Sequence, residues 1–234
     1  MCGRAKLVTD VSEIKLAFRI PGPAINTRAL WNGAPTHDFP IIRRNPEGVR
    51  SLDLLRWGLV PHWSKTDKAA YATINAKAET LAEKPTFREA WRKGRRCIVP
   101  LDAFYEWKAG ADGKKQPYAI SRADGTLLAV AGLWESKTLS DGTVLRTFTI
   151  ITTTANELLA QIHDRMPVIL AAEDVPMWLG ETDAPLADIA GLLKPCPAEW
   201  LEMTPVDPRM SNVRNQGEEF CQPIILATPA KLDP

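Results

Sequence analysis

The sequence predicts an α+β fold in a single domain. Short apolar runs bounded by Gly, Pro and Asp-Gly pairs are typical of strands, and several short segments carry helix-capping signals. The 234 residues show no internal repeat, no low-complexity linker and no sharp change of composition. A chain of this length suits one large domain. We therefore expect one domain over residues 1–234, with short helices beside the sheets.

Five short helices are expected. Three of them open with capping-box spacing, in which two side chains three residues apart satisfy the free amide groups of the first turn. These three begin at Asp10, Thr86 and Thr154 and end near Arg19, Lys93 and His163, respectively. The second has Trp91 on its apolar side and Gly94 just past its end. Two further helices are expected over 174–179, closed by Gly180, and over 184–194.

Strands are predicted where β-branched and apolar residues alternate or run together between breakers. The segments are 51–59, 97–101, 116–122, 126–132 and 144–152, with further short strands and loops over 26–50. The Asp-Gly pairs at 124–125 and 141–142 predict the turns that separate the last three. Residues 205–234 are expected to be mostly extended.

Composition excludes several classes of protein. The four cysteines, Cys2, Cys97, Cys196 and Cys221, lie far apart, without the spacing of a metal site or a disulfide framework. No apolar run reaches the roughly 18 residues of a membrane span, and the N-terminus has no signal-peptide core. We expect a cytoplasmic protein in a reducing compartment, with no metal, no cofactor and no membrane partner.

Charge is unevenly distributed although the net charge is +1. Residues 43–96 hold 13 Lys and Arg against 6 Asp and Glu, whereas residues 97–234 hold 11 against 19. A basic half with interleaved tryptophans suits a polyanion with stackable bases. Solvated surface charge is the alternative, and charge alone does not decide between the two.

Cys2 is the most informative residue, because it directly follows Met1. If an aminopeptidase removes Met1, Cys2 carries a free α-amine and a thiol on adjacent carbons. Such an aminothiol condenses with an aldehyde and closes to a five-membered thiazolidine, which no internal cysteine can do. The α-amine has a pKa of roughly 7.7–8.0 and is partly unprotonated at neutral pH. The alternative is an ordinary cysteine near a ragged terminus.

Three other residues are candidates for proton transfer and positioning beside such a group. Glu106 lies between two aromatic residues after an apolar run, where burial would raise the pKa of its carboxyl group. His163 titrates near neutrality, and Asn75 both donates and accepts hydrogen bonds. The alternatives are a solvent-facing strand residue for Glu106, a helix-terminal histidine for His163 and a turn residue for Asn75.

Other residues are candidates for binding DNA. Arg4, Lys77 and Arg165 would bind phosphates, and surface ion pairs are the alternative. Three tryptophans, Trp57, Trp63 and Trp107, would stack on bases. Because tryptophan is more often a core residue, we expect one or two of the eight to be exposed for stacking.

Six segments in this order together resemble the SRAP (SOS-response-associated peptidase) family, which processes abasic sites in DNA. They are Met1-Cys2-Gly3-Arg4, Asn32-Gly-Ala-Pro-Thr36, Arg56-Trp-Gly-Leu-Val-Pro-His-Trp63, Asn75-Ala-Lys-Ala-Glu-Thr80, Arg96-Cys-Ile-Val-Pro100 with Phe104-Tyr-Glu-Trp107, and Ile151-Thr-Thr with Ile162-His-Asp-Arg-Met-Pro167. Asn212-Val-Arg-Asn-Gln-Gly217 is similar to the closing segment of the family, and we assign it no role.

The resemblance implies a compact, β-rich α+β fold with twisted antiparallel sheets and a basic groove for single-stranded DNA. It implies that mature Cys2 forms a thiazolidine with the aldehyde of an abasic site, and that the crosslink shields the lesion. Asn75 would orient the sugar, Glu106 would act as general acid and base, and His163 would assist ring opening and the reverse reaction. The residues expected at the DNA are Arg4, Trp63, Lys77 and Arg165. At position 77 the family often has arginine, so the lysine predicts a weaker phosphate contact.

Two alternative functions remain open on the sequence. Cys2 would also serve a thiol peptidase, either a general one or one that removes only Met1 from the same chain, with a base and an oxyanion hole beside the thiol. The other alternative is a DNA-binding module in which Cys2 takes no part. We expect a monomer that binds single-stranded DNA containing abasic sites.

Overall fold

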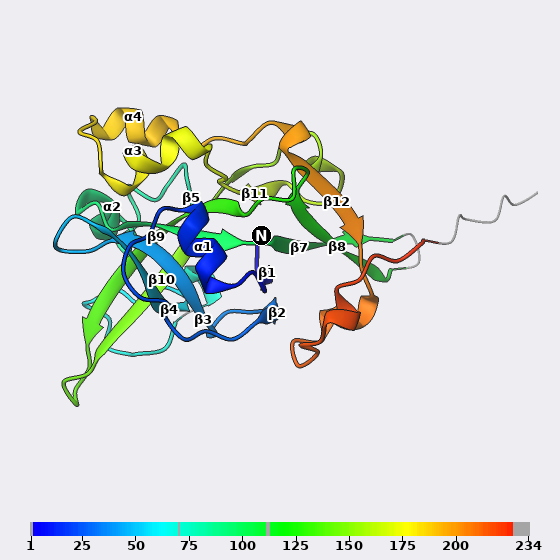
Figure 1. Ribbon diagram of the computed structural model, residues 1–234, viewed down its shortest axis with the longest axis horizontal. Helices are drawn as coiled ribbons and strands as arrows, with labels where there is room; N and C mark the ends of the chain where they lie inside the picture. Colours follow the sequence, from blue (N-terminus) through cyan, green and yellow to red (C-terminus); the bar gives the residue numbers. More distant parts are fainter. Residues whose placement is uncertain (1, 70, 111–112, 227–234) are drawn as a thin grey trace, which may run out of the picture.

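Two β-sheets form the body of the molecule in the computed structural model, which describes residues 2–69, 71–110 and 113–226 (Figure 1). The first sheet has the order β12-β8-β7-β1-β2. Its strands are β1 (Ala5–Leu7), β2 (Leu30–Gly33), β7 (Ala103–Ala109), β8 (Lys115–Arg122) and β12 (Leu201–Pro205). All four of its pairings are antiparallel.

The second sheet has the order β11-β10-β4-β3-β6-β9, with β9 also pairing β10 and with β5 beside β10. Its strands are β3 (Asp38–Arg44), β4 (Arg50–Trp57), β5 (Asn75–Lys77), β6 (Arg96–Leu101), β9 (Leu128–Thr138), β10 (Val144–Thr154) and β11 (Arg165–Pro167). Most pairings are antiparallel, but β10 runs parallel to β4 and β5. The β-rich α+β class is confirmed.

The helices are short and pack against one face of the second sheet. They are α1 (Val11–Ala17), α2 (Arg88–Arg92), α3 (Val175–Leu179) and α4 (Leu186–Gly191). Figure 1 shows α2, α3 and α4 gathered at one end of the molecule, opposite β12. Single 3-10 turns occupy Tyr71–Thr73, Leu159–Gln161, Ala172–Asp174, Ala198–Trp200, Pro208–Ser211 and Glu218–Phe220.

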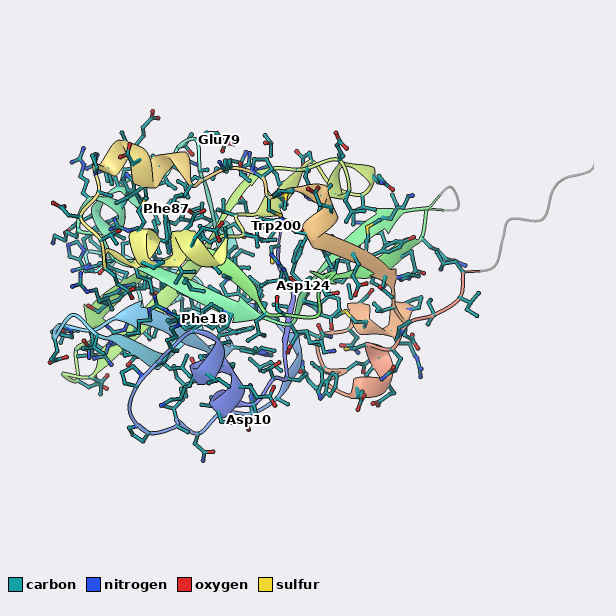
Figure 2. The ribbon with its side chains drawn as sticks, turned by 45° about the horizontal axis from the view of Figure 1, so that its top comes forward. Asp10, Phe18, Glu79, Phe87, Asp124 and Trp200 are labelled. Atoms are coloured by element: carbon teal, nitrogen blue, oxygen red, sulfur yellow. The ribbon has the colours of Figure 1, made fainter. Side chains whose placement is uncertain are left out.

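The capping predictions succeed unevenly. Asp10 caps α1 by accepting a hydrogen bond from the Ser12 amide at 2.7 Å, and Figure 2 shows Asp10 at one end of α1 and Phe18 at the other. At α2 the prediction was wrong, because Phe87 occupies the cap position without a side-chain hydrogen bond. Trp91 is nevertheless buried, and Gly94 has the left-handed φ of +65° expected just past the helix.

The helix predicted from Thr154 does not form. Thr154 is the last residue of β10 and pairs with Arg165 in β11, because the β-branched run at 152–154 favours a strand. Only a 3-10 turn follows, over Leu159–Gln161, and Asn156 Oδ1 just before it accepts a hydrogen bond from the Leu159 amide at 3.0 Å. His163 therefore follows a tight turn rather than ending a helix.

The two Asp-Gly pairs have different roles. Asp141-Gly142 joins β9 to β10 as a hairpin, as predicted. Asp124-Gly125 instead carries the chain from β8 in one sheet to β9 in the other, so it does not close a hairpin. The Asp124 carboxylate accepts from the Thr126 amide, which delays the start of β9 to Leu128. The expected extended tail also contains 3-10 turns within residues 205–226, and its last eight residues lie outside the described residues.

Alternation along the second sheet produces two cores. Ile42, Ile98 and Ile151 face the helices. Their neighbours Ile41 and Ile150 face the first sheet and pack with Phe104 and Ile120. Cys2 belongs to this second core and is fully buried. The fold therefore places the N-terminal segment in the layer between the two sheets.

Trp57 is the centre of that layer. It is fully buried, its ring stacks on Phe148 with centroids 6.1 Å apart, and it meets Phe39 edge to face at 5.5 Å. Its indole N–H donates to the Ile74 carbonyl at 3.0 Å. Of the three tryptophans expected to stack on bases, Trp57 is thus a core residue, whereas 55% of the Trp63 surface is exposed.

We expect the substitution Trp57→Phe to lower the free energy of unfolding by about 2–3 kcal/mol, because it leaves a cavity and removes the indole hydrogen bond to the Ile74 carbonyl, which keeps only its bond from the Ile150 amide. Urea unfolding followed by circular dichroism measures the change. Trp63→Phe is the matched control and should stay within about 0.5 kcal/mol of the wild type. Equal losses in both variants would show that the indole of Trp57 has no special part in this core.

Candidate functional site

Cys2 is held by a hydrogen bond from another element. The Asn75 side-chain amide donates to the Cys2 carbonyl at 2.8 Å. Asn75 begins β5, which is fixed in parallel register against β10 with Asn75 opposite Ile150. The Asn75 carbonyl oxygen Oδ1 is buried and accepts no hydrogen bond from the described residues. Asn75 thus fixes the backbone of Cys2 and presents a buried acceptor beside it.

Glu106 lies on the same side of β7 as the core that contains Cys2. Side chains alternate along a strand, so Phe104 and Glu106 face this core, while Tyr105 packs against Val206 and Met210. Ala5 of β1 pairs with Phe104, and the Tyr105 amide donates to the Arg4 carbonyl at 3.0 Å. This register brings the first residues of the chain alongside Glu106, which is only 5% exposed.

The Cys2 thiol is kept protonated by its surroundings. Burial raises the pKa of the thiol well above its ordinary value, and the charge of Glu106 raises it further. A Coulomb effect of this kind requires the carboxylate to be close to the sulfur. The site therefore combines a protonated thiol with a neighbouring carboxylate, and not a thiolate with a cation.

His163 approaches the site from the turn after β10. The Arg165 amide donates to Nδ1 of His163 at 2.9 Å, so the neutral imidazole carries its proton on Nε2. The Asp164 carboxylate lies 3.0 Å from the same Nδ1 and is the partner of the protonated ring. The turn after β10 thus fixes the orientation of the His163 ring through its Nδ1 atom.

One pocket of about 1030 Å³ joins these residues. Glu106, His163 and Arg4 line it, together with Gly3, which follows Cys2, and Ile74, which precedes Asn75. The remaining lining residues are Ala34, Pro35, Trp107, Lys114, Lys115, Pro208, Ser211 and Val213. The structure therefore brings Cys2, Asn75 and Glu106 together, and it places Glu106, His163 and Arg4 around one pocket beside them.

Arg4 is anchored at the rim of the pocket. Its guanidinium donates to Asn32 Oδ1 at 2.7 Å and to the Ser211 carbonyl at 3.0 Å, and it lies 5.9 Å from the centroid of the Trp107 ring. Partial burial lowers its pKa, although an arginine stays charged at neutral pH. Asn32 is fully buried and donates to the carbonyls of Met210, Asn212 and Asn215.

The other three predicted DNA residues lie outside the pocket lining. Lys77 is exposed two residues after Asn75 on β5, about 7 Å further along the strand. Trp63 is exposed in the loop after β4. Arg165 is only 9% exposed and forms a bidentate ion pair with Glu79, at 2.7 and 2.9 Å. This pair is the main cause of the lowered pKa of Glu79, and Figure 2 places Glu79 near the upper edge of the molecule.

Sequence reasoning missed several residues of the pocket. Lys114 and Lys115 come from the far end of the β7–β8 connection, and their charges were overlooked because they lie outside the basic stretch. Residues 208–213 form one wall of the pocket, and the segment 212–217, which was left without a role, overlaps this wall at Val213. The similarity of 212–217 to the family was the only signal that pointed to it.

Comparison with known proteins agrees with this geometry. The family model for the SOS response associated peptidase (SRAP) matches residues 1–213. The abasic site processing protein YoqW of Bacillus subtilis is 39% identical over 224 residues, which covers 95% of this chain and 99% of YoqW. The abasic site processing protein YedK of Escherichia coli is 34% identical over 197 residues, covering 83% and 84%. The abasic site processing protein HMCES of Gallus gallus is 34% identical over 237 residues, covering 88% and 69%.

Solved structures agree as well. A protein from Bacteroides thetaiotaomicron superposes with a TM-score of 0.84 at 26% identity, covering 96% of this chain and all of its own. A protein from Bordetella bronchiseptica gives 0.76 at 30% identity, covering 88% and 100%. Across the described ranges, no helix is long and apolar enough to cross a membrane. Because the family model matches residues 1–213, the chain belongs to the SRAP family.

Proposed function

We propose that this protein senses abasic sites in single-stranded DNA and shields them by a covalent bond from the mature N-terminal Cys2. The observation that carries the proposal is the clustering of Cys2, Asn75 and Glu106, with Asn75 hydrogen-bonded to the Cys2 carbonyl at the edge of one pocket. The printed names of the relatives, abasic site processing proteins, support the same substrate.

The proposed reaction starts at nitrogen. Removal of Met1, which lies outside the described residues, frees the α-amine of Cys2. That amine attacks the C1 aldehyde of the ring-opened sugar, and loss of one water gives an imine. The Cys2 sulfur then adds to the imine carbon, and the thiol proton is transferred to the nitrogen. The product is a thiazolidine, whose mass equals that of protein plus DNA minus one water.

The surroundings of Cys2 suit this order of steps. A thiol peptidase needs a thiol with a lowered pKa beside a cationic base, whereas burial and Glu106 raise the pKa of this thiol. An amine-first reaction tolerates a protonated thiol, because the sulfur attacks only after the imine has formed beside it. The high effective concentration of the thiol in the ring closure compensates for its low acidity.

Glu106 is the proposed proton carrier. It lies beside the thiol, so it would accept the thiol proton as sulfur attacks and would donate a proton to the departing water. Asn75 Oδ1 would accept from the α-amine or from a sugar hydroxyl, since it has no partner among the described residues. His163 would open the closed sugar ring and assist the reverse reaction.

DNA binding would rest on phosphate contacts and stacking, because an abasic site has no base to read. Arg4 at the pocket rim, with Lys77 and Arg165, would bind the flanking phosphates, and Trp63 would stack on a base. Lys115 on the opposite rim adds a further cation near the same pocket. We also propose that the protein acts on this DNA as a monomer and that it does so in the cytoplasm.

Cys2→Ala should abolish the crosslink completely, because it removes the sulfur that closes the ring. Intact mass spectrometry of the wild type with an abasic single-stranded oligonucleotide should show a heat-stable adduct at the mass of protein plus DNA minus water. The starting protein must lack Met1. A mature wild type without an adduct would contradict the proposal, and cleavage of added peptides would move the assignment to a peptidase.

Glu106→Gln should slow crosslinking by about 10²–10⁴-fold, the usual contribution of a positioned acid or base. Glutamine keeps the shape of the side chain but cannot transfer a proton. The measurement is the single-turnover rate of adduct formation at saturating DNA. Affinity for an unreactive abasic analogue should stay within about twofold, since Glu106 does not bind phosphate. A normal rate in this variant would remove Glu106 from the chemistry.

Glu79→Gln should increase DNA affinity by about threefold. The substitution releases Arg165 to bind phosphate, and it removes the negative charge beside Arg165. The increase should shrink as salt is raised from 50 to 200 mM, since phosphate contacts release counterions. Fluorescence anisotropy with the same unreactive oligonucleotide measures it, with Glu83→Gln as an exposed control on the same loop. Unchanged affinity would place Arg165 outside the DNA contact.

A further inference from the structure

The basic stretch at 43–96 is larger than the proposed site requires. Of its 13 Lys and Arg, only Lys77 is among the DNA contacts proposed above. Five others converge on a separate pocket of about 540 Å³, formed by Arg43, Arg44, Lys93, Arg95 and Arg96. No carboxylate from the described part of the chain lines this pocket, and it shares no lining residue with the Cys2 pocket.

Three of these five cations are neutralised. Arg43 pairs with Asp53 at 2.8 Å, Lys93 with Glu89 at 2.5 Å, and Arg95 with Glu135. For these three side chains, a network of surface ion pairs is a sufficient explanation. It does not account for the two cations that remain.

Arg44 and Arg96 have no carboxylate partner within the described ranges. Burial alone lowers the pKa of Arg96, with no acidic neighbour to oppose the shift. The half-buried charge of Arg96 is therefore uncompensated, which is costly unless an anion binds to it. The excess positive charge of the pocket is located at these two side chains.

The two guanidinium groups converge on one point. Arg96 Nε donates to the Trp178 carbonyl at 2.6 Å, and Arg44 donates through Nη1 to the Gly180 carbonyl. A Cβ atom placed on Gly180 would lie 3.4 Å from Arg96 Nη2 and 3.9 Å from Arg44 Nη1. These hydrogen bonds to carbonyls at the end of α3 explain part of the arrangement. Each guanidinium group has five N–H donors, and most of the ten donors of the two arginines do not bind these carbonyls.

Glycine keeps the two arginines uncovered. Gly48, Gly94 and Gly180 all have left-handed φ values, +79°, +65° and +74°, which require glycine in these turns. A Cβ on Gly48 would lie 3.0 Å from Arg44 Nη2, and one on Gly94 would lie 3.5 Å from Arg96 Nη1. The turns thus leave the donors accessible to a ligand.

The chemistry of the pocket suits phosphate rather than a base. Its only aromatic lining residue in the described chain is Trp134, with the guanidinium groups of Arg43 and Arg95 lying 4.6 and 5.8 Å from its centroid. A ring occupied by cations does not offer a face for a base to stack on. Paired guanidinium forks are well matched to the oxygens of a phosphate group.

We propose that this pocket binds the phosphodiester backbone of the same DNA strand outside the lesion, through Arg44 and Arg96. The identity of the ligand as DNA rests on the proposed function. β3 connects the two sites: Ala34 and Pro35, just before it, line the Cys2 pocket, and Arg44 ends it. Its length of about 20 Å sets the separation. The protein would therefore hold the DNA at two places, of which the lesion occupies one.

The test uses single-stranded DNA of two lengths, each carrying an unreactive abasic analogue. The short strand, of about 5 nucleotides, is as long as a small single-strand binding site, and the long strand, of about 30 nucleotides, exceeds such a site. The variant is Arg44→Gln/Arg96→Gln, and the control Arg146→Gln/Lys194→Gln removes two exposed charges that line neither pocket. Fluorescence anisotropy should show the variant binding the long strand about tenfold more weakly at 150 mM salt, since each lost phosphate contact costs about threefold. Binding of the short strand should be unchanged.

Equal affinity of the variant and the control for the long strand would overturn the proposal. Inorganic phosphate that raises the melting temperature of the wild type but not of the variant would show that the pocket binds small anions. If DNA length then had no effect on affinity, the pocket would bind only small anions, and this too would overturn the proposal. Crosslinking of a short aldehyde-bearing oligonucleotide reports separately on the proposed function and on correct folding of the variant. Failure of the wild type in that reaction would refute the Cys2 chemistry. The comparison of the two DNA lengths uses an unreactive analogue, so it would still test whether the pocket binds DNA.

Discussion

The hydrogen bond between Asn75 and the Cys2 carbonyl is the constraint on which the site depends. The first residues of a chain are usually exposed and poorly ordered, yet here Cys2 is completely buried between two sheets. A buried carbonyl without a partner would destabilise that arrangement, and Asn75 supplies the partner at 2.8 Å. Asn75 is fixed by the pairing of β5 with β10, so the second sheet determines the position of Cys2. Strand β7 of the first sheet brings Glu106 to the same place.

The two ends of the described chain hold each other in place. Arg4 reaches the Ser211 carbonyl, and Asn32 fastens both Arg4 and the carbonyls of the closing segment. Gln216 completes the link by donating to the Asn32 carbonyl at 2.8 Å. Burial of Asn32 strengthens these polar contacts, because water does not compete for them. The wall of the pocket at 208–213 is therefore a consequence of how the N-terminal strand is anchored.

The sequence predicted most strands, the α+β class and the residues of the candidate site, but for different reasons. Strands such as β6 and β10 are recognisable because their apolar runs are bounded by breakers, whereas the Thr154 capping box failed because β-branched neighbours and pairing with Arg165 favour a strand. Cys2 is a candidate because it follows Met1, and Glu106 because it lies between aromatic residues, but nothing local shows that residues 2, 75 and 106 meet, and only the family resemblance implied a common site. The Glu79–Arg165 pair and the walls at Lys115 and Ser211 depend on long-range packing, which spacing along the chain does not encode.

A buried, protonated thiol suits the proposed reaction, in which the nucleophile would wait for a rare lesion. Thiolates react with oxidants and with stray electrophiles, and the raised pKa of the Cys2 thiol disfavours both reactions. Glu106 contributes to that protection by its negative charge, and in the proposed reaction the same carboxylate would take the thiol proton once an imine is present. Proton transfer to Glu106 would neutralise the carboxylate as the carbon–sulfur bond forms, and this would remove the repulsion in the step that needs the sulfur. Selectivity for the aldehyde would then follow from the order of the proposed steps, amine before thiol, and not from a highly reactive cysteine.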